Sequence, residues 1–188
     1  MKPATLSSAG QSSTLPTVTL TVYSHRGTWT DAEAEAVSLG GHLVTINDVA
    51  EETWVWDTFS QFGGVDRTIW IGMTDAASEG DWVWISGEPV TFTYWAQVTN
   101  EPNNCGGNEN YGHIFPPWEY RAPFWNDILN SGEGGCGGGF AINGLVEMLT
   151  PPVGGIAELP NVSDSSAPNY IALAAVATVA LLALTATA

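Results

Sequence analysis

The chain has 188 residues, of which 44% are hydrophobic and nine are tryptophan. This length and composition suit one ordinary domain with a sizeable core plus a short extra segment, and they exclude a wholly disordered chain. Asp and Glu total 20 against four Lys and Arg, which gives a net charge of −16. Because nucleic acids and anionic membrane surfaces bind basic patches, neither is expected as a partner. An acidic surface suits cation binding, and it also keeps proteins apart in solution.

The first part of the expected domain predicts a strand followed by a helix. From Thr17 to Tyr23 polar and apolar residues alternate with the period of a half-buried strand. Thr30, with Glu33 three residues later, has the pattern of a capping box and should start a helix. Gly40-Gly41 should end that helix, because glycine readily adopts the left-handed backbone of a helix C-terminus.

A second helix should begin after Asn47 or Asp48 and end near Phe62, and short β segments follow it. These segments are separated by Gly, Pro, Asn and Asp, and they are Ile69–Gly72, Trp82–Ile85, Phe92–Trp95, Tyr111–Phe115 and Phe140–Leu149. The order predicts an α+β fold with two helices flanking short antiparallel sheets. Residues 75–130 have little regular pattern, and a long loop region in a compact domain is usually functional.

Both ends of the chain differ in composition from residues 17–150, the expected domain. Residues 1–16 lack the hydrophobic region of a signal peptide and indicate a flexible leader or the wrong start of a longer gene. Residues 151–169 form a linker rich in Pro, Gly and Ser. Residues 170–188 form an uncharged, Ala- and Leu-rich run that nearly reaches the ~30 Å hydrocarbon thickness of a bilayer. Three interpretations compete for this run: a minimal transmembrane anchor, a cleaved lipid-anchor signal, or a buried helix. A membrane-directed C-terminus is expected, with the domain on the extracellular face.

Two polar motifs carry the most chemical information, Glu101-Pro102-Asn103-Asn104 and Trp125-Asn126-Asp127. Calcium binds oxygen ligands from carboxylates and amide carbonyls. Five side chains could supply such a set if a loop and a strand bring the motifs together: Glu101, Asn103, Glu109, Asn126 and Asp127. A cis peptide bond before Pro102 would turn its two neighbours toward one point. The alternative is a pair of ordinary polar turns.

Together with upstream motifs, this pattern resembles the C-type lectin-like domain family over about Thr17 to Thr150. The upstream matches are Trp29–Ala34, Leu39–Ile46, Trp70-Ile71-Gly72-Met73, Trp82-Val83-Trp84, Gly87-Glu88-Pro89-Val90 and Trp95. The resemblance implies one principal calcium held by the five side chains above, in a long calcium-binding loop region. Two neighbouring sugar hydroxyls would complete the coordination shell. In this family Glu-Pro-Asn generally accompanies mannose-type sugars (mannose, glucose and N-acetylglucosamine, with equatorial 3- and 4-hydroxyls), whereas Gln-Pro-Asp accompanies galactose.

The resemblance also implies a second calcium next to the first. Asp75 and Glu79 match this auxiliary site, with Glu109 shared and Asn104 adding an amide. Many members have an acid at the position of Asn104, so the site here would carry one negative charge fewer. The alternative is that Asp75 and Glu79 only cap turns.

The cysteines depart from the family pattern. Cys105 and Cys136 are the two cysteines of the chain, and they either form one disulfide that joins the halves of the site or remain free thiols. The family's long disulfide corresponds to Ala36 and Val146, an apolar pair that would replace the bridge by packing.

The expected function is calcium-dependent carbohydrate binding by a surface-attached receptor. Its partner would be a glycan or glycoconjugate, and attachment to a membrane would cluster weak sites for avidity. No motif of nucleophilic or metal-dependent catalysis is present, so an enzyme is not expected. The alternative function is binding of a protein or another surface, such as ice, with calcium structural or absent. The insertion of residues 116–121 forms either a secondary sugar-contact surface or only a packed loop.

Overall fold

A computed structural model of the chain describes residues 17–136, 138–150 and 175–177. It has a sheet with strand order β6-β5-β3-β7-β1-β8, in which β2 also pairs with β7 and β4 with β3. The strands are β1 (Thr17–Arg26), β2 (His42–Leu43), β3 (Thr68–Thr74), β4 (Val83–Trp84), β5 (Tyr111–Ile114), β6 (Trp125–Ile128), β7 (Ile142–Thr150) and β8 (Ala175–Ala177). Strands β3 and β7 run parallel, and the other pairs are antiparallel.

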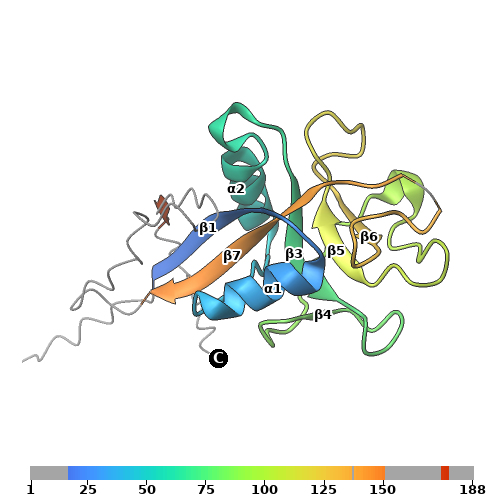
Figure 1. Ribbon diagram of the computed structural model, residues 1–188, viewed down its shortest axis with the longest axis horizontal. Helices are drawn as coiled ribbons and strands as arrows, with labels where there is room; N and C mark the ends of the chain where they lie inside the picture. Colours follow the sequence, from blue (N-terminus) through green and yellow to red (C-terminus); the bar gives the residue numbers. More distant parts are fainter. Residues whose placement is uncertain (1–16, 137, 151–174, 178–188) are drawn as a thin grey trace, which may run out of the picture.

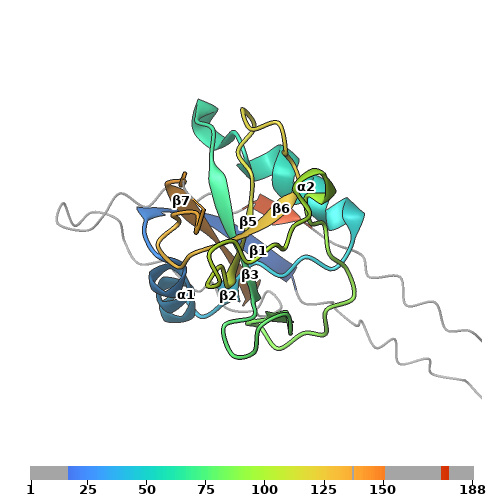
Figure 2. The ribbon, with the colours of Figure 1, turned by 90° about the vertical axis from the view of Figure 1, so that its right-hand side faces the viewer.

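Two helices cover the sheet, α1 (Trp29–Ser38) and α2 (Val49–Phe59), on opposite sides of β1 and β7 (Figure 1). Two short 3₁₀ helices, η1 (Phe62–Gly64) and η2 (Gln97–Thr99), lie in the connections. Thr17 pairs with Thr150, so the domain begins and ends at the same end of the sheet. The long loops that flank β5 and β6 gather at the other end (Figure 1), which faces the viewer in Figure 2. The predicted α+β class is therefore confirmed.

The core fixes the strand that carries the second polar motif. Trp125, the first residue of β6, is fully buried. Its ring centroid lies 5.7 Å from those of Trp84, Phe92 and Trp95, each in an edge-to-face arrangement. Edge-to-face contacts of this kind add to the hydrophobic gain from burial. The position of β6, and of the polar residues that follow Trp125, is therefore set by the core.

The expected apolar replacement of a long disulfide is also present. Ala36 on α1 and Val146 on β7 are both fully buried and form a small cluster of their own, against which Leu39 and Met148 pack. Packing here joins the first helix to the last strand of the domain without a covalent bond.

The predicted cap of the first helix is wrong. Thr28, not Thr30, is the N-cap: its hydroxyl accepts a hydrogen bond from the backbone N–H of Asp31 at 3.1 Å. Glu33 does not complete a capping box, because its carboxylate accepts from the Leu43 N–H at 2.9 Å and lies 2.6 Å from Nδ1 of His42. That contact ties α1 to β2. The second helix is capped by Asp48 as predicted.

The prediction of a strand at Phe92–Trp95 is also wrong. In this segment only Trp95 forms a bridge, an isolated parallel one with Trp125. The backbone touches β6 through two hydrogen bonds, from Trp125 N to the Tyr94 carbonyl at 2.8 Å and from Ala96 N to the Trp125 carbonyl at 2.9 Å. The aromatic side chains of this segment pack against the core instead. The aromatic-rich pattern reflects burial of side chains rather than a paired strand.

Of the predicted C-terminal segment, residues 170–188, the structure describes only three residues. Ala175–Ala177 form β8, which pairs with β1, and are not part of a helix. Among the residues with a described placement, no helix is both long and apolar enough to cross a membrane. The predicted leader (1–16), the linker (151–169) and the rest of the terminal run lie outside the described residues. A membrane-directed C-terminus therefore stays a prediction.

A buried carboxyl supports the tryptophan of β6. Oε2 of Glu52 on α2 accepts a hydrogen bond from Nε1 of Trp125 at 2.8 Å, while Oε1 is buried without a partner. Burial raises the pKa of Glu52 from 4.5 to about 8. Between these two values the folded chain holds a proton that the unfolded chain releases. The free energy of unfolding should therefore fall as the pH rises through this window.

We expect Glu52→Gln to flatten this pH dependence, because the amide resembles the protonated carboxyl and does not titrate. The measurement is the melting temperature of calcium-free protein between about pH 5 and about pH 8. Asp57→Asn changes an exposed acid on the same helix and should keep the slope of the wild type. An equal slope in Glu52→Gln and wild type would refute this role of Glu52.

Candidate calcium site

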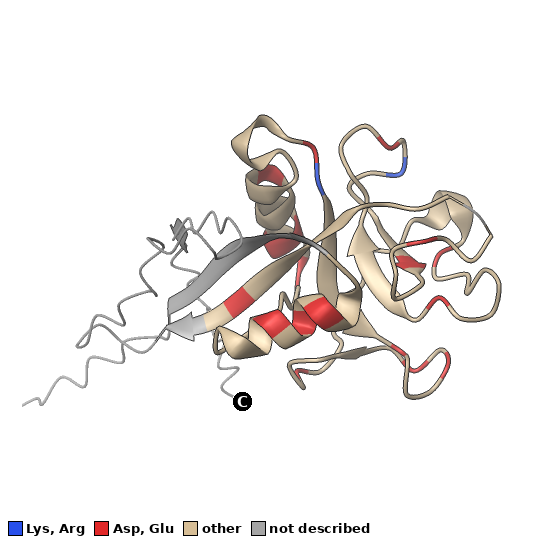
Figure 3. Ribbon diagram, in the orientation of Figure 1, with Lys and Arg blue, Asp and Glu red and all other residues tan. Residues whose placement is uncertain are grey.

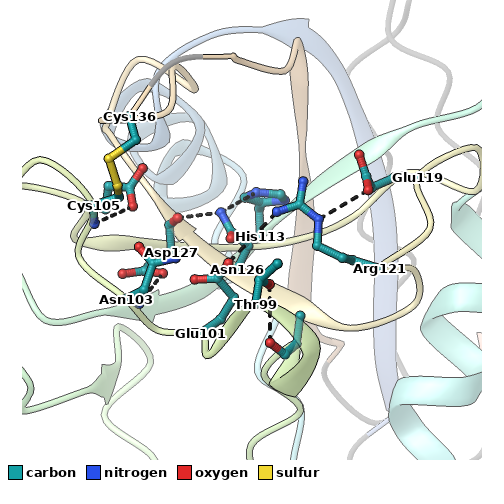
Figure 4. Close-up of polar contacts among 12 residues, drawn as sticks. Thr99, Glu101, Asn103, Cys105, His113, Glu119, Arg121, Asn126, Asp127 and Cys136 are labelled. Carbon is teal, nitrogen blue, oxygen red and sulfur yellow. Dashed lines mark hydrogen bonds and ion pairs between the residues drawn. A yellow bond between two sulfur atoms is a disulfide. The ribbon is translucent and has the colours of Figure 1, made fainter.

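Asp127 on β6 joins the sheet to the long loop. Its fully buried carboxylate accepts two backbone hydrogen bonds, at Oδ1 from Asn103 N at 3.0 Å (Figure 4) and at Oδ2 from Asn104 N at 2.7 Å. The Glu101–Pro102 peptide bond is cis, the isomer considered from the sequence for turning its two neighbours toward one point. The two polar motifs, which are separated by more than twenty residues in the sequence, are therefore in direct contact.

Glu109 joins the long loop to the glycine-rich loop before β7. Its Oε2 accepts from Cys105 N at 2.8 Å and its Oε1 from Gly135 N at 2.7 Å. Cys105 and Cys136 form a disulfide with their Cα atoms 5.5 Å apart, which resolves the choice between a bridge and free thiols. The backbones approach so closely here that a Cβ atom at Gly135 would collide with the Cys105 carbonyl. Glycine is required at this point.

The side chain of Asn126 is oriented by a buried histidine, His113. Its Nδ2 lies 3.2 Å from Nε2 of His113 and also donates to the carbonyl of Asp127 (Figure 4). Burial lowers the pKa of His113 to about 3, so the ring is neutral, and in the tautomer with its proton on Nδ1 the ring accepts this bond at Nε2. Both amide hydrogens of Asn126 are thus engaged. The amide oxygen is the atom that Asn126 can offer to a ligand.

Glu101 is buried beside an arginine. Its Oε1 lies 3.9 Å from Nη1 of Arg121, and its Oε2 is buried without a partner (Figure 4). Burial is the largest cause that raises the pKa of Glu101 to about 7. The neighbouring Asp127 also raises it, while hydrogen bonding to Thr99 and the charge of Arg121 lower it. A buried carboxyl with a free oxygen is suited to a cation, which would compensate its charge.

Four of the five predicted principal ligands line one pocket of about 360 Å³, namely Glu101, Asn103, Glu109 and Asn126. This volume lies within the ~300–1,000 Å³ range of small-molecule sites. Asp127 is not among the lining residues, although its carboxylate holds the backbone of Asn103. Acidic residues lie on both helices and along the loops (Figure 3), so the charge of the chain is not confined to this pocket.

The predicted second site is only partly assembled. Asp75 is buried, its Oδ2 accepts from Gly80 N at 2.8 Å, and its Oδ1 has no partner. Oδ1 of Asn104 accepts from the backbone N–H of Glu109 at 3.0 Å, which places these two predicted ligands together. Glu79, however, is exposed.

The donor chemistry of the principal set fits calcium. Each carboxylate oxygen has two lone pairs, so an oxygen that accepts one N–H keeps capacity for an ion. Glu101 and Asn126 supply oxygens that need not give up a protein hydrogen bond. Within the described part of the chain, however, no group of three or more His, Cys, Asp and Glu side chains could hold a metal ion. A calcium set here would therefore draw on other oxygens as well, such as the amide oxygens of Asn103 and Asn126.

Two residues of the site were missed from the sequence. Arg121 is the last of the four basic residues in the chain, and a lone cation beside an acidic loop was a usable signal. His113 gave no such signal, because its contact with Asn126 depends on the pairing of β5 with β6, in which these two residues are opposite each other.

Comparison with known proteins agrees with this geometry. A perlucin-like protein of Mytilus galloprovincialis is 35% identical over 102 residues, which cover 54% of this chain and 62% of that protein. The chain thus spans less than two thirds of this relative's length. The C-type lectin CEL-I from Cucumaria echinata has a similar structure, with a TM-score of 0.58 and 25% identity over 69% of this chain and 89% of that one.

A calcium-independent type II antifreeze protein shares the fold alone, at a TM-score of 0.55 and 22% identity over 79% of this chain and 95% of that one. The family model of the lectin C-type domain matches residues 25–131, more than half of the chain, from α1 to the end of β6. The chain belongs to the C-type lectin domain family, whose domains bind ligands and are not enzymes.

Proposed function

We propose that this chain binds carbohydrate with the help of calcium, through the pocket lined by Glu101, Asn103, Glu109 and Asn126. The observation that carries the proposal is the convergence of these four side chains in one pocket, with a free buried oxygen on Glu101. Calcium would be held by these four residues and Asp127, and it would polarise the hydroxyls of a bound sugar. The lectin relatives support carbohydrate as the ligand class.

The side chains around the pocket can recognise a pair of sugar hydroxyls. A carboxylate accepts a hydrogen bond from one hydroxyl, and an amide N–H donates to the other. Because the amide hydrogens of Asn126 are engaged by His113 and the Asp127 carbonyl, Asn103 is the amide that donates to the ligand. Glu101 and Asn103 therefore present an acceptor and a donor in the order that the family resemblance associates with mannose-type sugars.

A second candidate function is binding of a protein or of another surface without calcium. Both oxygens of Asp127 and both oxygens of Glu109 already accept backbone hydrogen bonds. The loop therefore has internal partners that order it in the absence of an ion. The fold shared with a calcium-independent antifreeze protein is compatible with this alternative.

The principal proposal also includes a second calcium, held by Asp75 and Glu79 with Asn104 and the shared Glu109. Asp75 is the better-placed of the first two, because it is buried and Glu79 is exposed.

We further propose an extracellular setting. The disulfide between Cys105 and Cys136 is typical of oxidising compartments. Most of residues 170–188, the predicted membrane-directed segment, lie outside the described residues.

We expect the chain to be retained on mannose-agarose in calcium and released by EDTA. Glu101→Gln/Asn103→Asp should weaken this retention by about tenfold or more, equivalent to ~1.4 kcal/mol. It should also increase retention on galactose-agarose, because the exchange reverses which position donates and which accepts. Glu133→Gln, a change at an exposed acid that does not line the pocket, should behave as the wild type. If neither column holds the wild type while calcium still raises its melting temperature, the ion is structural and the second candidate is favoured.

The disulfide should matter for stability and for calcium affinity. It closes a loop with a sequence separation of 31 residues, so Cys105→Ser/Cys136→Ser should lower the free energy of unfolding by about 2–4 kcal/mol. The two backbone N–H groups that donate to the Glu109 carboxylate belong to Cys105 and to Gly135, the residue before Cys136. Because Glu109 is a proposed calcium ligand, the variant should also bind calcium more weakly. Urea unfolding and calcium titration by calorimetry test the two effects separately. Equal calcium affinity in the variant and the wild type would exclude the second effect.

A further inference from the structure

The insertion of residues 116–121 between β5 and β6 forms a closed loop at the edge of the pocket. Three backbone hydrogen bonds close it, from Glu119 N to the Pro116 carbonyl (2.9 Å), from Ala122 N to the Glu119 carbonyl (3.0 Å) and from Phe124 N to the Arg121 carbonyl (3.0 Å). A ligand that met this loop would not have to order its backbone, which lowers the entropic cost of binding.

Arg121 fastens the loop to the principal site. Its guanidinium carbon lies 4.0 Å from the centroid of the Phe115 ring, its Nε donates to Oε1 of Glu119 at 3.1 Å, and its Nη1 lies 3.9 Å from Oε1 of Glu101 (Figure 4). These contacts hold the loop against one of the four pocket side chains of the proposed sugar site.

Trp118 extends the pocket with an aromatic wall. Its side chain is 64% exposed, although large aromatic residues are usually well buried. Its ring centroid lies 5.9 Å from that of Phe140, with 33° between the planes, so one part of the indole has an aromatic neighbour. Trp118 and Phe140 line the same pocket as Glu101 and Asn103. The pocket is thus polar where calcium is proposed and aromatic beside it.

We propose that Trp118 and Phe140 form a subsite for the second residue of a neutral oligosaccharide, which rests on the proposed function of the neighbouring site. A pyranose ring has an apolar face of C–H groups, and this face gains by leaving water to pack on an aromatic ring. With the terminal residue of a sugar in the principal site, its next residue would pack on Trp118 and Phe140, which line the same pocket.

The charges around the subsite select against acidic sugars. Glu101, Glu109 and Glu119 line the pocket, and the cation that also lines it, Arg121, is already paired with Glu119. Apart from the proposed calcium, which the principal site and the terminal sugar would surround, the side chains that line the pocket include no unpaired positive group to attract a carboxylate or sulfate. A neutral oligosaccharide is the ligand class that fits both parts of the pocket.

The test compares methyl α-mannoside with a neutral mannose trisaccharide, by calorimetry in calcium, for the full chain. The wild type should bind the trisaccharide more tightly than the mannoside. Trp118→Ala should weaken trisaccharide binding by roughly three- to tenfold, the range expected for an aromatic contact, and leave mannoside binding unchanged. Tyr120→Ala is the matched control, because Tyr120 is an aromatic residue of the same loop, 74% exposed, that does not line the pocket. It should bind both sugars as the wild type does.

Equal trisaccharide affinity in Trp118→Ala and wild type, with mannoside still bound, would overturn the subsite and leave the proposed function standing. Failure of the wild type to bind either sugar would instead overturn the proposed function, and the subsite with it. Tighter binding of a sialylated trisaccharide than of the neutral one would overturn the assignment to neutral sugars. Because Trp118 is largely exposed, its variant should melt at the wild-type temperature.

Discussion

The central part of the long loop before β5 is held in position by one buried carboxylate, that of Asp127. The loop between β4 and β5 has little regular structure of its own, and the two backbone hydrogen bonds from Asn103 and Asn104 to Asp127 fix its central part. Hydrogen bonds to a charged group contribute about 1.5–3 kcal/mol each. Asp127 can hold the loop only because Trp125, two residues before it, is enclosed by aromatic rings and bonded to Glu52. The site therefore depends on the core for its geometry.

A second carboxylate, that of Glu109, extends the same arrangement to the glycine-rich loop, where the disulfide reinforces it covalently. At the opposite end of the sheet the connection between α1 and β7 is apolar, through Ala36 and Val146. The covalent bridge thus lies where backbone is irregular and few apolar contacts are available. Where α1 meets β7, apolar packing joins the two elements without a covalent bond. This distribution is physically reasonable, because loops gain little from hydrophobic burial.

Local patterns were sufficient to predict much of this fold. Alternation predicted β1, the cap at Asp48 predicted α2, and the two polar motifs predicted that Glu101 and Asp127 belong to one site. The strand predicted at Phe92–Trp95 was wrong because its aromatic pattern reflects packing on the core, and the cap of the first helix was wrong because two similar residues compete for it. Thr28 and Thr30 have the same capping chemistry, and the choice depended on Glu33 being engaged by β2. The contacts of Arg121 with Glu101 and of His113 with Asn126 join different elements, so they depend on strand pairing that no local pattern contains.

The engagement of Asn126 has a consequence for how selectivity is divided within the site. His113 and the Asp127 carbonyl occupy both amide hydrogens of Asn126, so this residue can offer only an acceptor to a ligand. The donor must then come from Asn103, and the acceptor beside it from Glu101, both on the same short loop segment. The order of donor and acceptor is thus determined by that loop segment. The sheet determines where the segment lies, through Asp127 on β6. If sugar binds here as proposed, its preference would be set by two side chains of the loop, Glu101 and Asn103, and could change without altering the core that supports them.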